Sequence, residues 1–154
     1  MKLLRNSGNE RVIDRLREWL ASGASVDLVS PTFSLHAFAE MREMLNRFDR
    51  CRLLLGDEAS LAGSLFGGPA DIAFRGKLQG RWLAREAAEW VRKRADVRCA
   101  SAQPPQSLMV VQANEHRRAL LGTCSFTTEG LGITPAGQLG LVQAADANDE
   151  AAAL

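Results

Sequence analysis

Residues 25–55 read SVDLVSPTFSLHAFAEMREMLNRFDRCRLLL, and this stretch decides the fold. It opens on a short β-rich segment that Pro31 closes, and it ends on the compact apolar run 51–55. Between the two, Ser34 is placed to cap a helix whose apolar residues recur at helical spacing. Two short apolar strands joined by a helix are typical of a βαβ unit with parallel strands. The sequence therefore predicts an α/β fold.

Two other segments have the periodicity of amphipathic helices. Residues 9–21 alternate apolar and charged faces and are followed by Gly23, a residue that often ends helices. Residues 80–95 carry a clearer apolar stripe among arginines and glutamates. The segment between the βαβ unit and this helix, residues 57–78, is interrupted by glycines, so we expect a loop with one short helical turn there.

The second half of the chain is predicted to consist of strands. Residues 97–100 are expected to form an edge strand. Residues 108–112 and 116–123 have the pattern of a hairpin joined by the turn 113–115. A Gly-rich stretch then leads to a last strand at residues 139–144.

Composition indicates one soluble domain. The 154 residues are 46% hydrophobic and 24% charged, a balance that excludes a disordered chain. We expect the domain to span residues 1–145, with residues 146–154 as an acidic, Ala-rich tail or linker. Cys51, Cys99 and Cys124 are widely spaced, as in a reducing compartment, and no segment is apolar for long enough to cross a membrane. A cytoplasmic location follows as the expectation.

Residues 122–131 read GTCSFTTEGL, and they resemble the end of a phospholipase D superfamily motif. That motif runs His, any residue, Lys, four residues, Asp, six residues, then Gly-Ser-any-Asn, and continues as Phe-Thr-x-x-Gly-Leu. In the superfamily its His attacks phosphorus, while its Lys and Asn hold the phosphate oxygens. The order of predicted elements also resembles half of that fold over nearly the whole chain. The resemblance implies an α/β phospholipase D-like half with a mixed central β-sheet flanked by helices on both faces.

The spacing of the motif assigns four positions without a gap. Leu108 stands at the His position, Val110 at the Lys position, Glu115 at the Asp position and Ser125 at the Asn position. Neither aliphatic side chain supplies a lone pair or a proton for covalent hydrolysis, and both indicate a strand that has returned to core packing. We therefore expect that this chain is not an enzyme and has neither a cofactor nor a metal site.

A narrower resemblance concerns three short segments, residues 2–6, 26–31 and 38–41. They are similar to the N-terminal phospholipase D-like domain found ahead of some bacterial Snf-type DNA helicases. This resemblance implies a parent protein that is an ATP-dependent helicase, with the motor following the tail, because this chain has no Walker-type phosphate loop. Since active superfamily members bring two halves together, it also implies a homodimer.

Basic residues gather in the middle of the chain and on the hairpin, and they predict a surface that binds DNA or another nucleic acid through its phosphates. The residues are Arg75, Lys77, Arg81, Arg85, Arg92, Lys93, Arg94, Arg117 and Arg118. The alternative is a solvated helix face that Glu86 and Glu89 partly neutralise, in which case the chain is a protein-interaction module without DNA binding.

Three further interpretations concern a thiol site, a non-standard enzyme site and the tryptophans. Cys124 and His116 could pair as a thiol nucleophile and base, although no third orienting group is evident. A phosphodiesterase or nuclease with a non-standard site is the remaining enzymatic alternative. Trp19, Trp82 and Trp90 fall at helical spacing and are expected to lie in the core.

Overall fold

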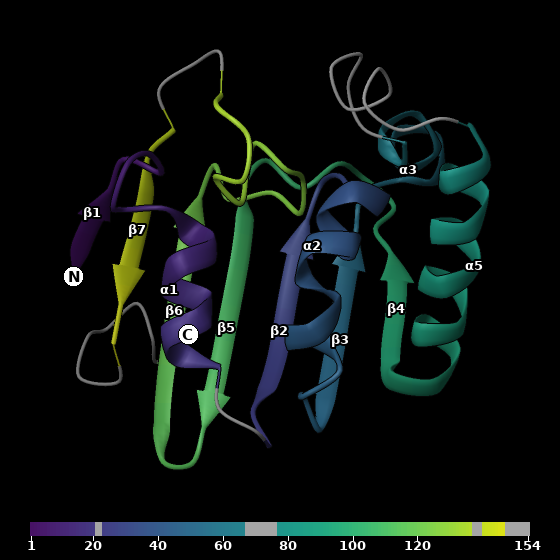
Figure 1. Cartoon of the computed structure of the whole chain (residues 1–154). Coiled ribbons are helices and arrows are strands. Elements are labelled where there is room, and N and C mark those ends of the chain that lie inside the picture. The colour runs from purple at the N-terminus through teal and green to yellow at the C-terminus, as the bar shows by residue number, and fades with distance from the viewer. Residues whose placement is uncertain (21–22, 67–76, 137–139, 147–154) are drawn as a thin grey trace.

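The computed structural model describes residues 1–20, 23–66, 77–136 and 140–146, which form a single sheet with helices packed on it (Figure 1). The strand order is β1-β7-β6-β5-β2-β3-β4. The strands are β1 (Lys2–Leu4), β2 (Ser25–Ser30), β3 (Arg50–Leu55), β4 (Ala95–Cys99), β5 (Ser107–Ala113), β6 (His116–Gly122) and β7 (Val142–Ala145). The helices are α1 (Val12–Trp19), α2 (Leu35–Leu45), α3 (Glu58–Ser64) and α5 (Lys77–Arg94).

The sheet is mixed, and its two halves meet at β2. Strands β2, β3 and β4 are parallel, whereas β5, β6, β7 and β1 pair in antiparallel fashion. Strand β2 belongs to both halves, because it pairs with β3 in parallel and with β5 in antiparallel register. The predicted α/β class, the βαβ unit and the mixed sheet are confirmed.

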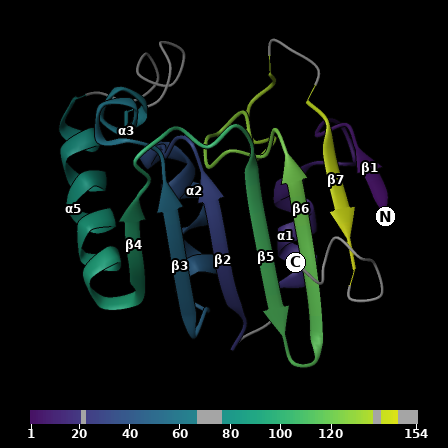
Figure 2. The same cartoon turned by 180° about the vertical axis from the view of Figure 1, so that it is seen from behind.

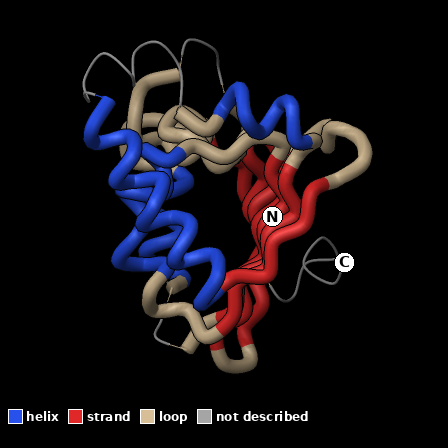
Figure 3. Tube along the Cα trace, turned by 90° about the vertical axis from the view of Figure 1, so that its right-hand side faces the viewer, coloured by secondary structure: helices blue, strands red, loops and turns tan. Residues whose placement is uncertain are grey.

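Helices α1, α2 and α5 all lie on the same face of the sheet. Seen from behind, the strands are uncovered (Figure 2), and the side view shows the long helices on one side of the strands (Figure 3). The expectation of helices on both faces thus does not hold for the described part of the chain. Its cause is topological: β2, β3 and β4 follow one another in the same direction, and right-handed crossovers then place α2 and α5 on the same side.

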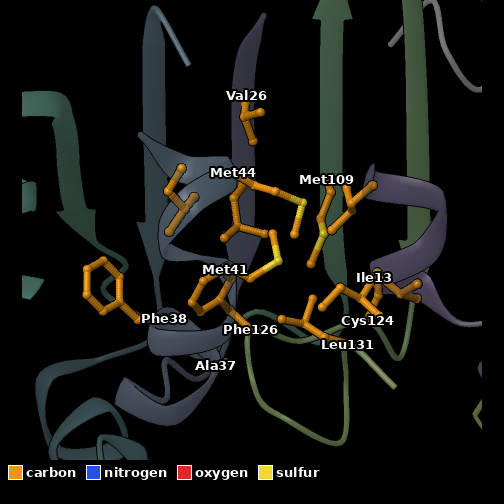
Figure 4. Close-up of a cluster of buried hydrophobic side chains, with 14 of the residues drawn as sticks. Ile13, Val26, Ala37, Phe38, Met41, Met44, Met109, Cys124, Phe126 and Leu131 are labelled. Atoms are coloured by element: carbon orange, nitrogen blue, oxygen red, sulfur yellow. The ribbon is translucent and has the colours of Figure 1, made fainter. Parts of the chain in front are cut away.

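The hydrophobic core fills the space between these helices and the sheet (Figure 4). Met41 and Met44 of α2 meet Met109 of β5 at its centre. Phe38 is 1% exposed and packs its ring against Trp90 of α5, with the ring centroids 5.6 Å apart. The capping role expected of Ser34 is confirmed, since its Oγ accepts hydrogen bonds from the amides of His36 and Ala37.

Some boundaries differ from the sequence-based expectation. Strand β1 was not expected, and α3 lies within the segment that we expected to be a loop with one helical turn. The last strand was predicted at residues 139–144, and the structure has it at Val142–Ala145. Residue 139 and most of the predicted tail lie outside the described residues. None of the described helices is long and apolar enough to span a membrane.

Candidate nucleic-acid interface

The motif-like segment 122–131 begins with the last residue of β6 and continues as a loop that packs against the carboxyl end of β2. Ser30 Oγ accepts a 2.8 Å hydrogen bond from the Phe126 amide, and its hydroxyl donates to Thr32 O at 2.6 Å. The rings of Phe33 and Phe126 stack with their centroids 4.8 Å apart. The Ser34 amide donates to Phe126 O at 2.9 Å, so the loop is tied directly to the start of α2.

Within this loop the hydroxyl groups contact one another and the backbone. Ser125 Oγ lies 3.2 Å from Thr127 Oγ1, which accepts a 2.9 Å hydrogen bond from the Gly130 amide. Ser125 and Thr127 are both half-buried. The Asn position of the motif therefore holds a small hydroxyl whose described partner is another side chain of the same loop.

Leu108 and Val110 are not core residues, contrary to the sequence-based interpretation. Both are half-buried and project from the uncovered face of the sheet, because the side chains of β5 that enter the core are those of Ser107, Met109 and Val111. Side chains alternate along a strand, so the periodicity alone could not say which set would be covered. Glu115 is exposed in the hairpin turn, at the end of β6 remote from Ser125.

Cys124 and His116 cannot act together as nucleophile and base. They lie near opposite ends of β6, with His116 exposed in the first position of the strand. Cys124 is fully buried, and burial raises the pKa of its thiol to about 12. Its sulfur lies 3.9 Å from Ser107 O, so it behaves as a small core side chain with a weak donor.

Helix α5 presents three arginines to solvent along one side. Arg81, Arg85 and Arg92 are exposed and spaced by four and seven residues, so they form a stripe on the outer face. Among the described residues none of the three has an ion-pair partner. These are the members of the predicted basic surface that the structure brings together.

The other predicted residues have different surroundings. Lys93 pairs with Glu89 at 4.0 Å, and Arg94 Nη1 donates to Asn46 O at 3.0 Å. With Arg92 they occupy the last turn of α5, where positive charge stabilises the helix whatever it binds. Arg75 lies outside the described residues, and the side chain of Lys77 is likewise not described.

The two arginines of the hairpin project to opposite faces of the sheet. Arg118 lies on the helical side, 5.8 Å from the ring centroid of Trp19 and 3.5 Å from the Asp146 carboxylate. Arg117 is exposed, and Nη2 donates to Gln112 Oε1 at 3.3 Å. The hairpin therefore does not extend the stripe on α5.

Trp82 is exposed beside this stripe and is not a core residue as expected. Its side chain is 49% exposed, because the inward stripe of α5 is formed by Leu83, Ala87 and Trp90. The Arg42 guanidinium lies over the indole, 5.3 Å from the ring centroid, and pairs with Glu86 at 3.4 Å. The sequence contained a signal for the exposure of Trp82, because this residue lies one position before Leu83, where the inward apolar stripe of α5 begins.

A second group of arginines surrounds Asp27 on the uncovered face, and sequence reasoning missed two of its members, Arg50 and Arg52. Hydrogen bonds from Arg52 hold the pKa of Asp27 below its ordinary value, and the charges of Arg50 and Arg117 act in the same direction. The alternation of β3 was the available signal, since Arg50 and Arg52 alternate with the buried residues Cys51 and Leu53.

Comparison with known proteins identifies the fold. No family model matches the sequence, and neither does any curated protein. Among solved structures, the chain is similar to two mutants of yeast tyrosyl-DNA phosphodiesterase 1, with TM-scores of 0.53 and 0.52 and 10% sequence identity. Each comparison covers 94% of this chain but only 31% and 32% of the two phosphodiesterase chains, about a third of their length. The chain thus has a phospholipase D-like α/β fold, as predicted.

These comparisons contradict the prediction that the chain is not an enzyme. Both similar structures are of a phosphodiesterase, of which the match covers about a third. The prediction relied on the residues at the motif positions, chiefly Leu108 and Val110. Other polar groups lie outside the motif, among them the buried imidazole of His36 in the first turn of α2.

Proposed function

We propose that this chain binds nucleic acid through the outer surface of α5, as the phospholipase D-like domain of a DNA-processing protein. The observation that carries the proposal is the exposed indole of Trp82 beside Arg81 and Arg85. Arginines neutralise backbone phosphates without reading sequence. An exposed aromatic ring offers a stacking surface to an unpaired base, so the combination favours single-stranded nucleic acid.

The test is fluorescence anisotropy of a labelled oligothymidine titrated with the chain at low and moderate salt. Replacing Arg81 and Arg85 together by alanine should weaken binding about 10-fold at low salt. It should also reduce the slope of log affinity against log salt by about 1.4, since each lost phosphate contact on a single strand contributes about 0.7. Changing Trp82 to alanine should weaken single-strand binding and spare duplex binding, because paired bases cannot stack on the ring.

The matched control replaces Arg15 and Arg17 by alanine. These arginines are carried by α1, at the other end of the sheet, and the change removes the same net charge (Figure 1). It should leave the affinity close to that of the parent. Equal affinities for the two double variants would contradict the proposed surface.

We extend the proposal to the setting of the domain. The resemblance of residues 2–6, 26–31 and 38–41 to domains ahead of Snf-type helicases supports a place beside a DNA helicase motor. The two phosphodiesterase chains are about three times as long as this chain. That ratio supports a domain that acts within a larger protein or as a pair of identical copies.

Phosphodiester hydrolysis is a second candidate function, favoured by the fold shared with phosphodiesterases. Of the two histidines, His36 lies in the first turn of α2, which is bonded through Ser34 to the loop 122–131, whereas His116 lies at the far end of the sheet. His36 is buried, and no described group bonds to its Nδ1. Metal-free hydrolysis of bis-p-nitrophenyl phosphate should fall to background in His36→Asn and persist in His116→Asn. Equal rates in both variants would exclude His36 from any such reaction.

A further inference from the structure

The sheet face turned away from the helices carries an apolar row that crosses four strands. Leu54 of β3 pairs with Val29 of β2, Val29 with Leu108 of β5, and Leu108 with Leu121 of β6. Leu54 is 39% exposed and the other three are half-buried, although the described part of the chain places no helix over them (Figure 2). Contiguous apolar side chains on a sheet face of this kind mark a surface that another element covers.

Charged side chains border the row, with Arg98 in line with Leu54 at its end and the others on the side of the hairpin turn, and positive charge prevails among them. Asp27 is bonded to Arg52, and Asp96 lies 4.0 Å from Arg98, so these two pairs are neutral. Arg50 and Arg117 remain, and among the described residues neither has an ion-pair partner. Four arginines against two aspartates leave a net charge of +2 on this face.

We propose that this face binds an amphipathic helix of a partner protein, with its apolar side on the row and acidic residues directed at Arg50 and Arg117. The length of the apolar row agrees with the size of such a helix. Four strands about 4.8 Å apart make a row about 14 Å long, which matches about ten helical residues at 1.5 Å each. A helix about 10–12 Å in diameter brings its flank close to the long side chains of the neighbouring arginines.

Charge separates this occupant from the alternatives. A second copy of the chain would place two faces of +2 against each other, which disfavours a face-to-face dimer. A nucleic acid would meet the arginines but would gain nothing from the aliphatic row, which has no aromatic side chain for stacking. An acidic amphipathic helix would cover the apolar row with its apolar side and pair its acidic residues with the arginines.

The probe is a fluorescein-labelled 18-residue helical peptide with leucines along one face and glutamates along the other. A second peptide has lysine at every glutamate position, and both are titrated against the full chain by fluorescence anisotropy. The parent chain should bind the acidic peptide at least 10-fold more tightly than the basic one. Exchanging both Arg50 and Arg117 for glutamate should invert this preference. Leu108→Gln should weaken both peptides, and the Arg81 and Arg85 double variant should bind them as the parent does.

Three outcomes would overturn the proposal. The first is equal affinity for the two peptides, unchanged by the charge exchange. The second is loss of oligothymidine binding on exchanging Arg50 and Arg117, which would make the face a nucleic-acid surface. The third is a dimer in sedimentation velocity that Leu108→Gln dissociates, which would make the occupant a second copy. Circular dichroism of each variant verifies the fold, because all the changed side chains project from the surface.

Discussion

Replacing Gly130 by alanine should lower the free energy of unfolding by about 3 kcal/mol, the upper part of the usual range for overpacked sites. A Cβ on Gly130 would lie 2.2 Å from Ser125 O and 2.8 Å from Ser125 N. These are backbone atoms of the same tight loop, so relief requires the loop itself to move away from β2. Thermal unfolding followed by circular dichroism should show a midpoint about 9 °C lower in a domain of this size.

The matched control is Gly63→Ala in α3, where an added Cβ would meet no atom within 4 Å. Alanine is favoured over glycine inside a helix by about 1 kcal/mol, so this variant should be as stable as the parent or slightly more so. A Gly130→Ala variant with the parent's midpoint would show that the loop accepts a side chain. The glycine of the GTCSFTTEGL segment would then have no structural explanation.

Replacing Asn6 by alanine should lower the free energy of unfolding by about 4 kcal/mol, about 3 from three hydrogen bonds and about 1 from the backbone conformation. Asn6 Oδ1 accepts a 2.9 Å hydrogen bond from the Val12 amide and so caps α1, while Nδ2 donates to Gly130 O at 2.9 Å and to Glu129 O at 3.2 Å. Each such bond contributes about 1 kcal/mol. Asn6 also has a φ of +53°, a conformation that asparagine tolerates better than alanine. Urea unfolding at constant temperature measures the difference.

Asn114→Ala supplies the control, because Asn114 has a similar φ of +55° but is exposed in the hairpin turn. The free energy of unfolding of Asn114→Ala should fall only by the cost of the left-handed backbone conformation, about 1 kcal/mol. Equal losses at the two positions would mean that the side-chain bonds of Asn6 do not contribute to stability. The comparison therefore separates backbone strain from the link between α1 and the loop.

The local elements of the fold could be predicted because their signals are local. The βαβ unit follows from the apolar runs of β2 and β3 and from Ser34 at the start of α2. Helix α5 follows from its apolar stripe. Strand β1 could not be predicted, because its three residues form a strand only by pairing with β7 at the other end of the chain.

Which side chains are exposed in the candidate sites could not be predicted, because hydrophobic periodicity does not say which face of the sheet the helices cover. Leu108 and Val110 alternate with buried residues, and only the one-sided arrangement of the helices leaves them uncovered. The alternation of side chains along β6 also separates Arg117 from Arg118, which project from opposite faces of the sheet. The predicted strand 51–55 includes Arg52 but not Arg50, and it is the register of β3 with Asp27 that makes the two arginines part of a cluster.

The position of β2 between the two halves of the sheet governs how this chain can fold during its synthesis. Its pairing with β3 is available early, but its other edge waits for β5, about 80 residues later in the sequence. Until then one edge of the central strand offers unpaired amides and carbonyls to any passing chain. Strand β1 waits longer still, because β7 is nearly the last described segment to leave the ribosome. Strand β1 is thus made before the other described strands but is among the last to be fixed in the sheet.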